Sequence, residues 1–241
     1  MKRIGSAVVV FVLFASIASA QMPGGAPPKN PSAALAKFLG KDLAFTATAS
    51  VVTQKQSGRN PETTVMSFAV LEGKIRNEVD LTKMSGVKKQ DAAGMKDMGM
   101  DRMVILTLPS KPVVYMIYPA LESYYELPRS TNQTDGAGAK VERTELGSET
   151  IAKHPCTKTK VTVTEADGKI SESLVWEATD LKKFPIQYQV AEGAETTTTT
   201  FQDINRDKPD ASLFELPANY KQYGNMQQLI MGNMQRMMKQ Q

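Results

Sequence analysis

The sequence predicts a mainly β protein of the α+β class: a curved antiparallel sheet of about ten strands with a few short helices. Short runs of alternating apolar and polar residues recur between residues 42 and 201, a pattern typical of strands with one buried face. Short turns, several containing glycine or proline, join neighbouring runs, so consecutive strands are expected to pair antiparallel. Such a sheet must hide its apolar face by curling, under helices or against a second sheet.

The first expected strand shows this pattern most clearly. Phe45, Ala47 and Ala49 alternate with Thr46 and Thr48, so one face is apolar and the other polar. The other expected strands cover residues 65–71, 74–81, 103–108, 113–118, 123–127, 157–165, 170–178, 185–190 and 196–201. A polar loop, residues 129–140, interrupts the series.

Two neighbouring strands, residues 103–108 and 113–118, are apolar at both odd and even positions. Strands of this kind are covered on both faces. A curled sheet with something packed inside explains the pattern, and the core of a β-sandwich explains it equally well. The residues alone leave both arrangements open.

Residues 1–20 have the order of a cleavable secretory signal peptide: two basic residues, an apolar run from about residue 7 to 17, and small residues 18–20. The apolar run is shorter than the ~20 residues that span a bilayer, which disfavours a membrane anchor. We therefore expect a bacterial protein that is periplasmic or secreted, starts near Gln21 and has no transmembrane segment after cleavage.

The mature chain is expected to begin with a flexible leader. Residues 21–30, QMPGGAPPKN, contain three prolines and two glycines, which suit neither a helix nor a central strand. Residues 31–39 then predict a short amphipathic helix, with proline at its first position and Gly40 after its end. We take residues 31–223 as a single domain and residues 224–241 as a tail.

Composition excludes several classes of function. The chain has 29 Lys and Arg against 25 Asp and Glu, and loss of the signal peptide removes two basic residues, which leaves 27 against 25. This even balance, without a basic stripe, does not fit a nucleic-acid binder. A single cysteine forms no intrachain disulfide, and one cysteine with one histidine do not supply the usual zinc ligands. No cofactor is expected.

The same two residues are weak candidates for catalysis. His154 and Cys156 stand two apart, which suggests a metal corner or a nucleophile with its base. Pro155 separates them at the entrance of a strand, and this favours a buried structural cysteine. Carboxylates are plentiful, but their pairing across a fold cannot be read from a sequence. We expect a protein that is not an enzyme.

Several short motifs then occur in the order of a known group. They are Gly147, Glu149, Ile151 and Cys156 in LGSETIAKHPC, Trp176 and Pro185 in SESLVWEATDLKKFPIQYQV, Phe214, Pro217 and Tyr220 in SLFELPANYKQY, and the strand pair PVVYMIYPALESYYELP. Over residues 42–223 the chain resembles an uncharacterised group of bacterial periplasmic proteins with the fold of the outer-membrane lipoprotein carriers LolA and LolB. The resemblance implies an incomplete β-barrel with helices on its concave side, where the carriers hold acyl chains.

From the signal peptide, the hairpins, the doubly apolar strands and this resemblance, we expect an exported protein that binds a lipid, an acyl chain or a lipoprotein on the concave face. The residues expected to line the cavity are Phe45, Phe68, Ile75, Ile105, Tyr115, Ile117 and Trp176. The alternative is a structural or protein-interaction module whose own side chains fill the concavity.

Methionines gather in residues 84–102, which are expected to form a loop, and just beyond. Met95, Met98, Met100 and Met103 offer soft thioether ligands that suit Cu(I), so a periplasmic Cu(I)-binding protein is a second alternative. Flexible methionine side chains also form adaptable apolar lids or fill gaps in a core. The sequence favours the lid or core interpretation.

The tail predicts an amphipathic helix over residues 226–238, because its apolar residues stand three or four apart. The expected stripe consists of Met226, Leu229, Ile230, Met234, Met237 and Met238. Such a stripe can cap the sheet, dock on a partner protein or lie on a membrane. Docking on its own domain or fraying in solution is the favoured interpretation.

Overall fold

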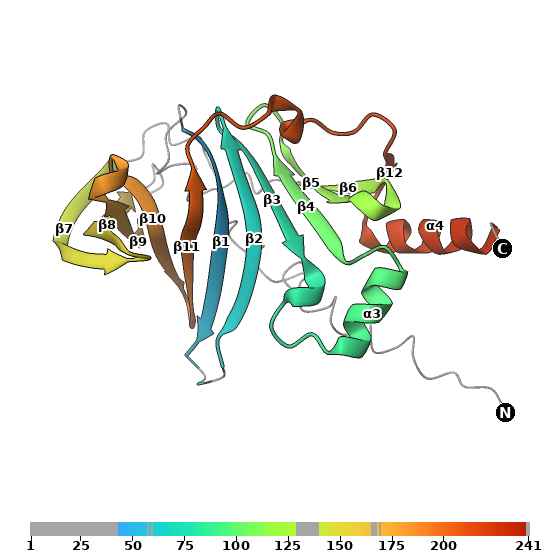
Figure 1. The fold of residues 1–241 in the computed structure, drawn as a ribbon, viewed down its shortest axis with the longest axis horizontal. Coiled ribbons are helices and arrows are strands. Elements are labelled where there is room, and N and C mark those ends of the chain that lie inside the picture. Colours follow the sequence, from blue (N-terminus) through green and yellow to red (C-terminus); the bar gives the residue numbers. More distant parts are fainter. Residues whose placement is uncertain are drawn as a thin grey trace.

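The computed structural model describes residues 43–56, 58, 60–128, 140–164, 168 and 170–239. The expected signal peptide, leader and helix over residues 31–39 lie outside these residues, as does nearly all of the polar loop. In the described part, twelve strands form one sheet, accompanied by two α-helices and short 3-10 turns. The predicted mainly β fold with a curved, open antiparallel sheet is confirmed (Figure 1).

The strands follow one another in the sheet in the order β12-β6-β5-β4-β3-β2-β1-β11-β10-β9-β8-β7. Their bounds are Ala44–Lys55 (β1), Glu62–Leu71 (β2), Lys74–Asp80 (β3), Arg102–Thr107 (β4), Val113–Tyr118 (β5), Ser123–Pro128 (β6), Lys140–Ile151 (β7), His154–Thr164 (β8), Ile170–Ala178 (β9), Phe184–Glu192 (β10), Glu195–Asn205 (β11) and Lys221–Tyr223 (β12). The chain starts at the centre and runs outward to β6. It resumes at the opposite edge with β7 and returns to β11, which pairs with β1. Among the strand pairs of the described residues, only the short contact between β12 and β6 is parallel.

Three elements differ from the sequence-based expectation. The sheet has twelve strands where about ten were expected, because β7 and the three-residue β12 were missed. Strand β7 exposes nearly every side chain, so it has no buried face to create an apolar period. Residues 84–102 are not a loop throughout, because they contain helix α3, Lys89–Asp97.

Cross-strand pairing divides the side chains between two faces. Phe68 pairs with Ala47 on one side and Asn77 on the other, and Asn77 pairs with Ile105, so these four side chains share a face. We term it the inner face because α3 and the second helix, α4 (Met226–Lys239), pack against it. Residues that alternate with these, such as Arg76, form the outer face.

Strands β4 and β5 are covered on both faces, as predicted. On the inner face Met103 and Met116 lie under the two helices. On the outer face Leu106 and Ile117 are buried with Phe214, which belongs to the chain segment that returns from β11 to β12. The cover is therefore helical on one face and a returning segment on the other.

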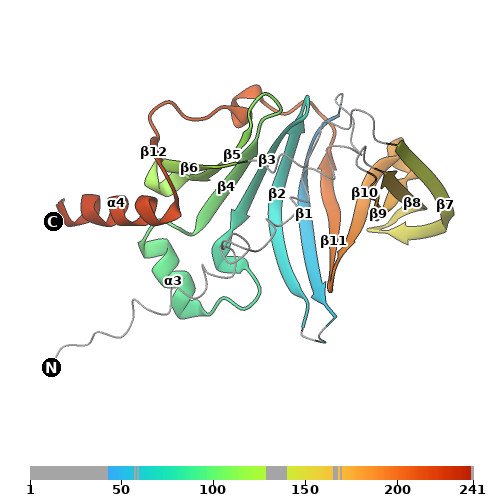
Figure 2. The same cartoon turned by 180° about the vertical axis from the view of Figure 1, so that it is seen from behind.

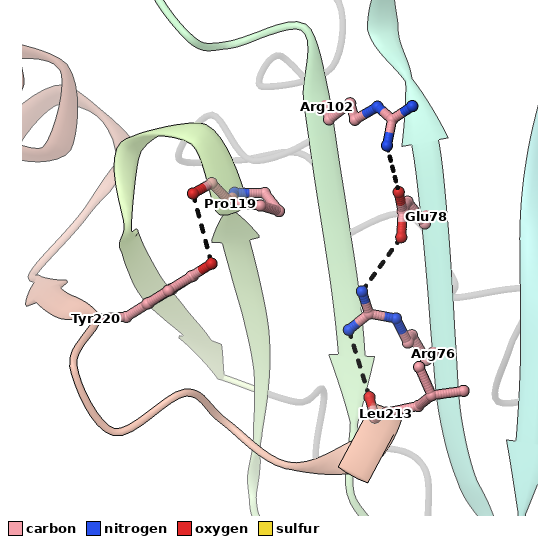
Figure 3. Close-up of polar contacts among 6 residues, drawn as sticks. All are labelled: Arg76, Glu78, Arg102, Pro119, Leu213 and Tyr220. Carbon is pink, nitrogen blue, oxygen red and sulfur yellow. Dashed lines mark hydrogen bonds and ion pairs between the residues drawn. The ribbon is translucent and has the colours of Figure 1, made fainter. Parts of the chain in front are cut away.

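Polar contacts hold this returning segment across the outer face (Figure 3). The Arg76 guanidinium donates to the Leu213 carbonyl oxygen at 3.3 Å and is itself paired with Glu78. The Tyr220 hydroxyl donates to the Pro119 carbonyl oxygen at 3.4 Å. Because Phe214 and Tyr220 belong to the SLFELPANYKQY motif, this motif has a structural role here.

Candidate functional site

The inner face carries two apolar clusters. The first, termed the aromatic cluster, is built from Phe45, Phe68, Phe184 and Phe201 of β1, β2, β10 and β11. Their rings interlock at centroid distances of 4.9 Å for Phe45–Phe184 and 5.2 Å for Phe68–Phe201. Phe45 and Phe201 have no exposed surface. This half of the inner face is closed by its own rings.

The second, termed the methionine cluster, lies between strands β3–β6 and the two helices. It brings together eight of the chain's 14 methionines: the buried Met95, Met100, Met103 and Met116, and the half-buried Met66, Met84, Met98 and Met226. The other buried members are Val79, Leu81, Tyr118, Leu121, Tyr125 and Leu229. Unbranched thioether side chains adapt to neighbours of irregular shape, unlike the interlocked rings.

Helix α3 enters this cluster because the chain reverses direction at its end. Gly99 has φ of +67°, and a Cβ at this position would lie 3.0 Å from Leu121 Cδ2, so both conformation and space favour glycine. Immediately afterwards the Met100 amide donates to the Met95 carbonyl oxygen at 2.8 Å. Met95 and Met100 are thereby both buried on the inner face.

Helix α4 docks through a narrow set of contacts. Leu229 is fully buried, and Gly232 approaches the ring of Tyr223 so closely that a Cβ would lie 2.4 Å from Cε1. The Asn233 side chain, 2% exposed, donates to Leu229 O at 2.9 Å and to the Ser123 hydroxyl at 3.4 Å. Arg236 donates to the main-chain carbonyl oxygen of Leu121, in the 3-10 turn between β5 and β6, at 3.0 Å. These residues stand at i, i+3, i+4 and i+7, on one side of the helix.

The docking side of α4 contains only part of the expected stripe, because Met226, Leu229 and Ile230 pack on the methionine cluster. Leu229 faces the domain, but Met234 and Met238 are 49% and 67% exposed, and Met231 is 53% exposed. Figure 2 shows the helix extending beyond the edge of the sheet at β6 and β12. The expected stripe is only partly right, because Gly232, Asn233 and Arg236 make specific contacts that apolar spacing does not encode.

The methionine cluster is electrically neutral. Tyr118 is 1% exposed, and its hydroxyl donates to the Met103 sulfur at 3.5 Å. Burial raises the pKa of Tyr118 and, to a smaller extent, the pKa of Tyr125. Both phenols remain uncharged at physiological pH, so the surface beneath α4 suits an uncharged, apolar occupant.

Four of the seven residues expected to line a cavity lie on the inner face, three in one buried cluster and one beside the other. Phe45, Phe68 and Ile75 belong to the aromatic cluster, and Ile105 borders the methionine cluster. Tyr115 and Ile117 lie on the outer face, because they pair with Leu106 and Val104. Their strands are apolar on both faces, so alternation alone did not indicate which set points inward.

Trp176 is buried in the same cluster as Phe45, Phe68 and Ile75, but its cross-strand pairing places it on the outer face. It pairs with Lys158 and Gln187, and its indole N–H donates to Glu149 Oε2 at 2.9 Å. The Lys158 ammonium lies 5.0 Å from the ring centroid and 2.8 Å from Glu149 Oε1. These hydrogen bonds, led by that from Lys158, lower the pKa of Glu149. Two of the motif residues, Glu149 and Trp176, are thus bonded to each other.

The residues considered for metal binding or catalysis occupy packed positions. Met95, Met100 and Met103 are buried in the methionine cluster and Met98 is half-buried, so a Cu(I) site there stays a prediction. Cys156 is buried, as predicted, and burial raises the pKa of its thiol. His154 turns its ring to Asp180, at 2.8 Å. Within the described ranges, no group of three His, Cys, Asp or Glu side chains is placed to hold a metal ion.

Two of the open cavities in the described part are lined by residues outside the methionine cluster. One, of about 340 Å³, lies mainly on the outer face and is lined by residues such as Thr48, Arg76 and Asp203. The other, of about 300 Å³, is lined by residues that include Glu149 and Cys156. Neither α3 nor α4, the helices of the described residues, is long and apolar enough to cross a membrane.

No known family model matches the sequence, and no curated protein matches it. Similar solved structures include lipoprotein LppX of Mycobacterium tuberculosis, at 10% identity and a TM-score of 0.41, over 75% of this chain and 94% of that one. A LolA superfamily protein from Nitrosomonas europaea follows, at 10% identity and 0.35, over 77% and 94% of the two chains. LprF from Mycobacterium bovis has 11% identity and 0.34, over 79% and 98%. TM-scores below 0.5 do not decide what this chain binds.

Proposed function

We propose that this protein is an exported, non-enzymatic carrier that binds an apolar ligand, such as the acyl chain of a lipid or lipoprotein, on its inner face. The ligand takes the place that α4 occupies and packs against the methionine cluster. The observation that carries the proposal is the make-up of this cluster, in which eight methionines and two neutral tyrosines meet beneath two short helices. Such a surface can close on itself or on an acyl chain with little rearrangement of the sheet.

The contacts of α4 support its role as a displaceable cover. Among the residues that the structure describes, Leu229 is its one fully buried apolar side chain, whereas Met231, Met234 and Met238 are exposed. The buried Asn233 Oδ1 has no hydrogen-bond partner within the described chain, which weakens the docked state. A ligand that replaces Leu229 therefore competes with a modest set of contacts.

The alternative, an interaction module without a small ligand, has a specific observation in its favour. The rings of the aromatic cluster pack against one another, and the side chains of the methionine cluster do the same beneath α4. Binding therefore requires α4 or the methionine side chains to move. This requirement separates the two functions experimentally, since only a carrier binds more tightly when α4 is loosened.

The test compares binding of a fluorescent fatty acid by the wild-type protein, Leu229→Ala and Met231→Ala, each purified after export. Loss of a buried leucine destabilises by about 2–5 kcal/mol, which here weakens the docking of α4. We expect Leu229→Ala to bind the probe more tightly than the wild type, and Met231→Ala, an exposed residue of the same helix, to match the wild type. Native mass spectrometry checks for a co-purified lipid. Failure of all three proteins to bind the probe or to carry lipid would refute the carrier and leave the interaction module.

A further inference from the structure

Among the described residues, strand β7 forms a free edge at the end of the sheet opposite α4. In the described part of the chain it pairs with β8 alone, over twelve residues (Figure 1). Its side chains are exposed on both faces, including the apolar Val141 at 55% and Leu146 at 51%. A long edge of this kind presents a row of main-chain donors and acceptors to another strand.

The geometry of the β7–β8 hairpin determines which main-chain groups face outward. The connecting residues Ala152 and Lys153 have φ of +48° and +73°, as a two-residue type I′ turn requires, so the flanking pair Ile151–His154 is hydrogen-bonded. Hydrogen-bonded and non-hydrogen-bonded pairs alternate along the hairpin, so the next pair, Thr150–Pro155, should not be hydrogen-bonded. This agrees with Pro155, which has no N–H to exchange.

The alternation of inward and outward main-chain groups shifts once along β7. A bulge between Glu145 and Gly147 inserts one residue, which shifts the alternation in the first half of the strand. Counting back through the bulge, Val141, Arg143 and Glu145 direct their N–H and C=O groups away from β8. These three residues form the regular part of the free edge.

The outward residues complement a second copy of themselves. When two β7 strands pair antiparallel with Thr144 opposite Thr144, Arg143 of each copy lies opposite Glu145 of the other. Glu142 then faces Leu146 and Lys140 faces Ser148, so no like charges stand opposite each other. Arg143 already pairs with Glu177 at 2.7 Å and is 45% exposed. Its guanidinium has five N–H donors, enough to reach both carboxylates.

We propose that β7 is a self-association edge, at which a second copy of this chain adds its own β7 antiparallel about a two-fold axis at Thr144. Charge complementarity favours a second copy as the partner, because Arg143 and Glu145 of one strand lie opposite Glu145 and Arg143 of the other. Both residues direct their main-chain N–H and C=O groups outward. The bulge beyond Glu145 ends the regular pairing and limits the contact to a short segment. A contact of this size produces a weak dimer, with a Kd on the order of 10–100 μM.

The test is sedimentation equilibrium of the full exported chain over about 5 to 500 μM. We expect the wild type to dimerise, and Arg143→Glu to raise the Kd about tenfold or more, because it places like charges opposite each other. The double variant Arg143→Glu/Glu145→Arg restores the opposite charges and should restore the dimer. Lys89→Glu makes the same charge change on exposed α3 and should leave the Kd unchanged.

A backbone variant tests the edge without relying on charge. Glu145→Pro removes an outward N–H, which no bond to β8 uses, and should abolish the dimer while circular dichroism and thermal unfolding stay close to the wild type. A wild-type protein that is monomeric throughout this range overturns the proposal. A dimer that survives both Arg143→Glu and Glu145→Pro also overturns it, because the interface then lies elsewhere. Fatty-acid binding plays no part in either result, so this proposal and the carrier proposal fail independently.

Discussion

Replacing Gly232 in α4 by alanine sets two effects of opposite sign against each other. In an isolated helix, alanine is more favourable than glycine by about 1 kcal/mol. In this protein the new Cβ would lie 2.4 Å from Tyr223 Cε1 and 2.6 Å from Tyr223 Oη. Carbon atoms in favourable contact lie about 3.5–4.0 Å apart, so the ring or the helix must move by roughly 1 Å or more.

The sign of the result depends on what that movement costs. Tyr223 belongs to β12 and packs against the methionine cluster, and its ring also lies 4.8 Å from the Lys221 ammonium. Overpacking of this kind costs about 1–3 kcal/mol, which offsets or exceeds the gain in helix propensity. We therefore expect Gly232→Ala to weaken the docking of α4 by up to about 2 kcal/mol, although the helix itself becomes a better helix.

Gly94 in α3 provides a matched control. It is also helical, but a Cβ at this position would meet nothing within 4 Å. Gly94→Ala should therefore stabilise α3 by close to the full ~1 kcal/mol of helix propensity.

Hydrogen exchange measured helix by helix reads both effects. Amides of α4 should exchange faster in Gly232→Ala than in the wild type, whereas amides of α3 should exchange more slowly in Gly94→Ala. If Gly232→Ala instead slows exchange in α4 as much as Gly94→Ala does in α3, the close approach to Tyr223 does not constrain the helix. The account of how α4 docks would then be wrong.

Two further predictions concern the sheet. Phe201→Ala should lower the free energy of unfolding by about 3–5 kcal/mol in chemical denaturation, because Phe201 is fully buried among aromatic rings; a loss below ~1 kcal/mol would contradict the interlocked packing. The fluorescence of Trp176, the only tryptophan, should change at a pH below 4.5, the ordinary pKa of Glu149, because hydrogen bonds from Lys158 and Trp176 lower that pKa. A lowered folded-state pKa means that the stabilisation is present above pH 4.5 and is lost as the pH falls through the folded value. Glu149→Gln should remove this transition, and a midpoint at or above 4.5 would exclude the bond.

Local periodicity predicted the parts of the fold that depend on local pattern. Phe45, Ala47 and Ala49 were assigned to one buried face because they alternate with polar residues, and the structure buries all three. The double cover of β4 and β5 was likewise predictable from apolar residues at every position. In both places the sequence pattern and the burial have the same physical cause, removal of apolar side chains from water.

Contacts between residues far apart in the sequence could not be predicted from local periodicity. Asn233 docks α4 through Ser123, 110 positions away, and Arg236 does so through Leu121, 115 positions away. Neither polar residue has a local signal that distinguishes it from an exposed one. The same limitation applies to Tyr115 and Ile117, whose face is set by pairing with β4 and not by their own alternation.

The two clusters of the inner face differ in how they can change. The aromatic cluster joins strands that are held to one another by main-chain hydrogen bonds, so separating Phe45 from Phe184 requires the sheet itself to deform. The methionine cluster is closed by α4, which can leave while every main-chain bond between β3 and β6 remains. Substitutions in the aromatic cluster should therefore change mainly stability, and substitutions in the methionine cluster should change mainly ligand binding. Phe201→Ala should reduce stability with little effect on fatty-acid affinity, whereas Leu229→Ala should raise that affinity more than it lowers the midpoint of global unfolding. The reverse order would mean that the aromatic half, and not the methionine half, is the part that opens.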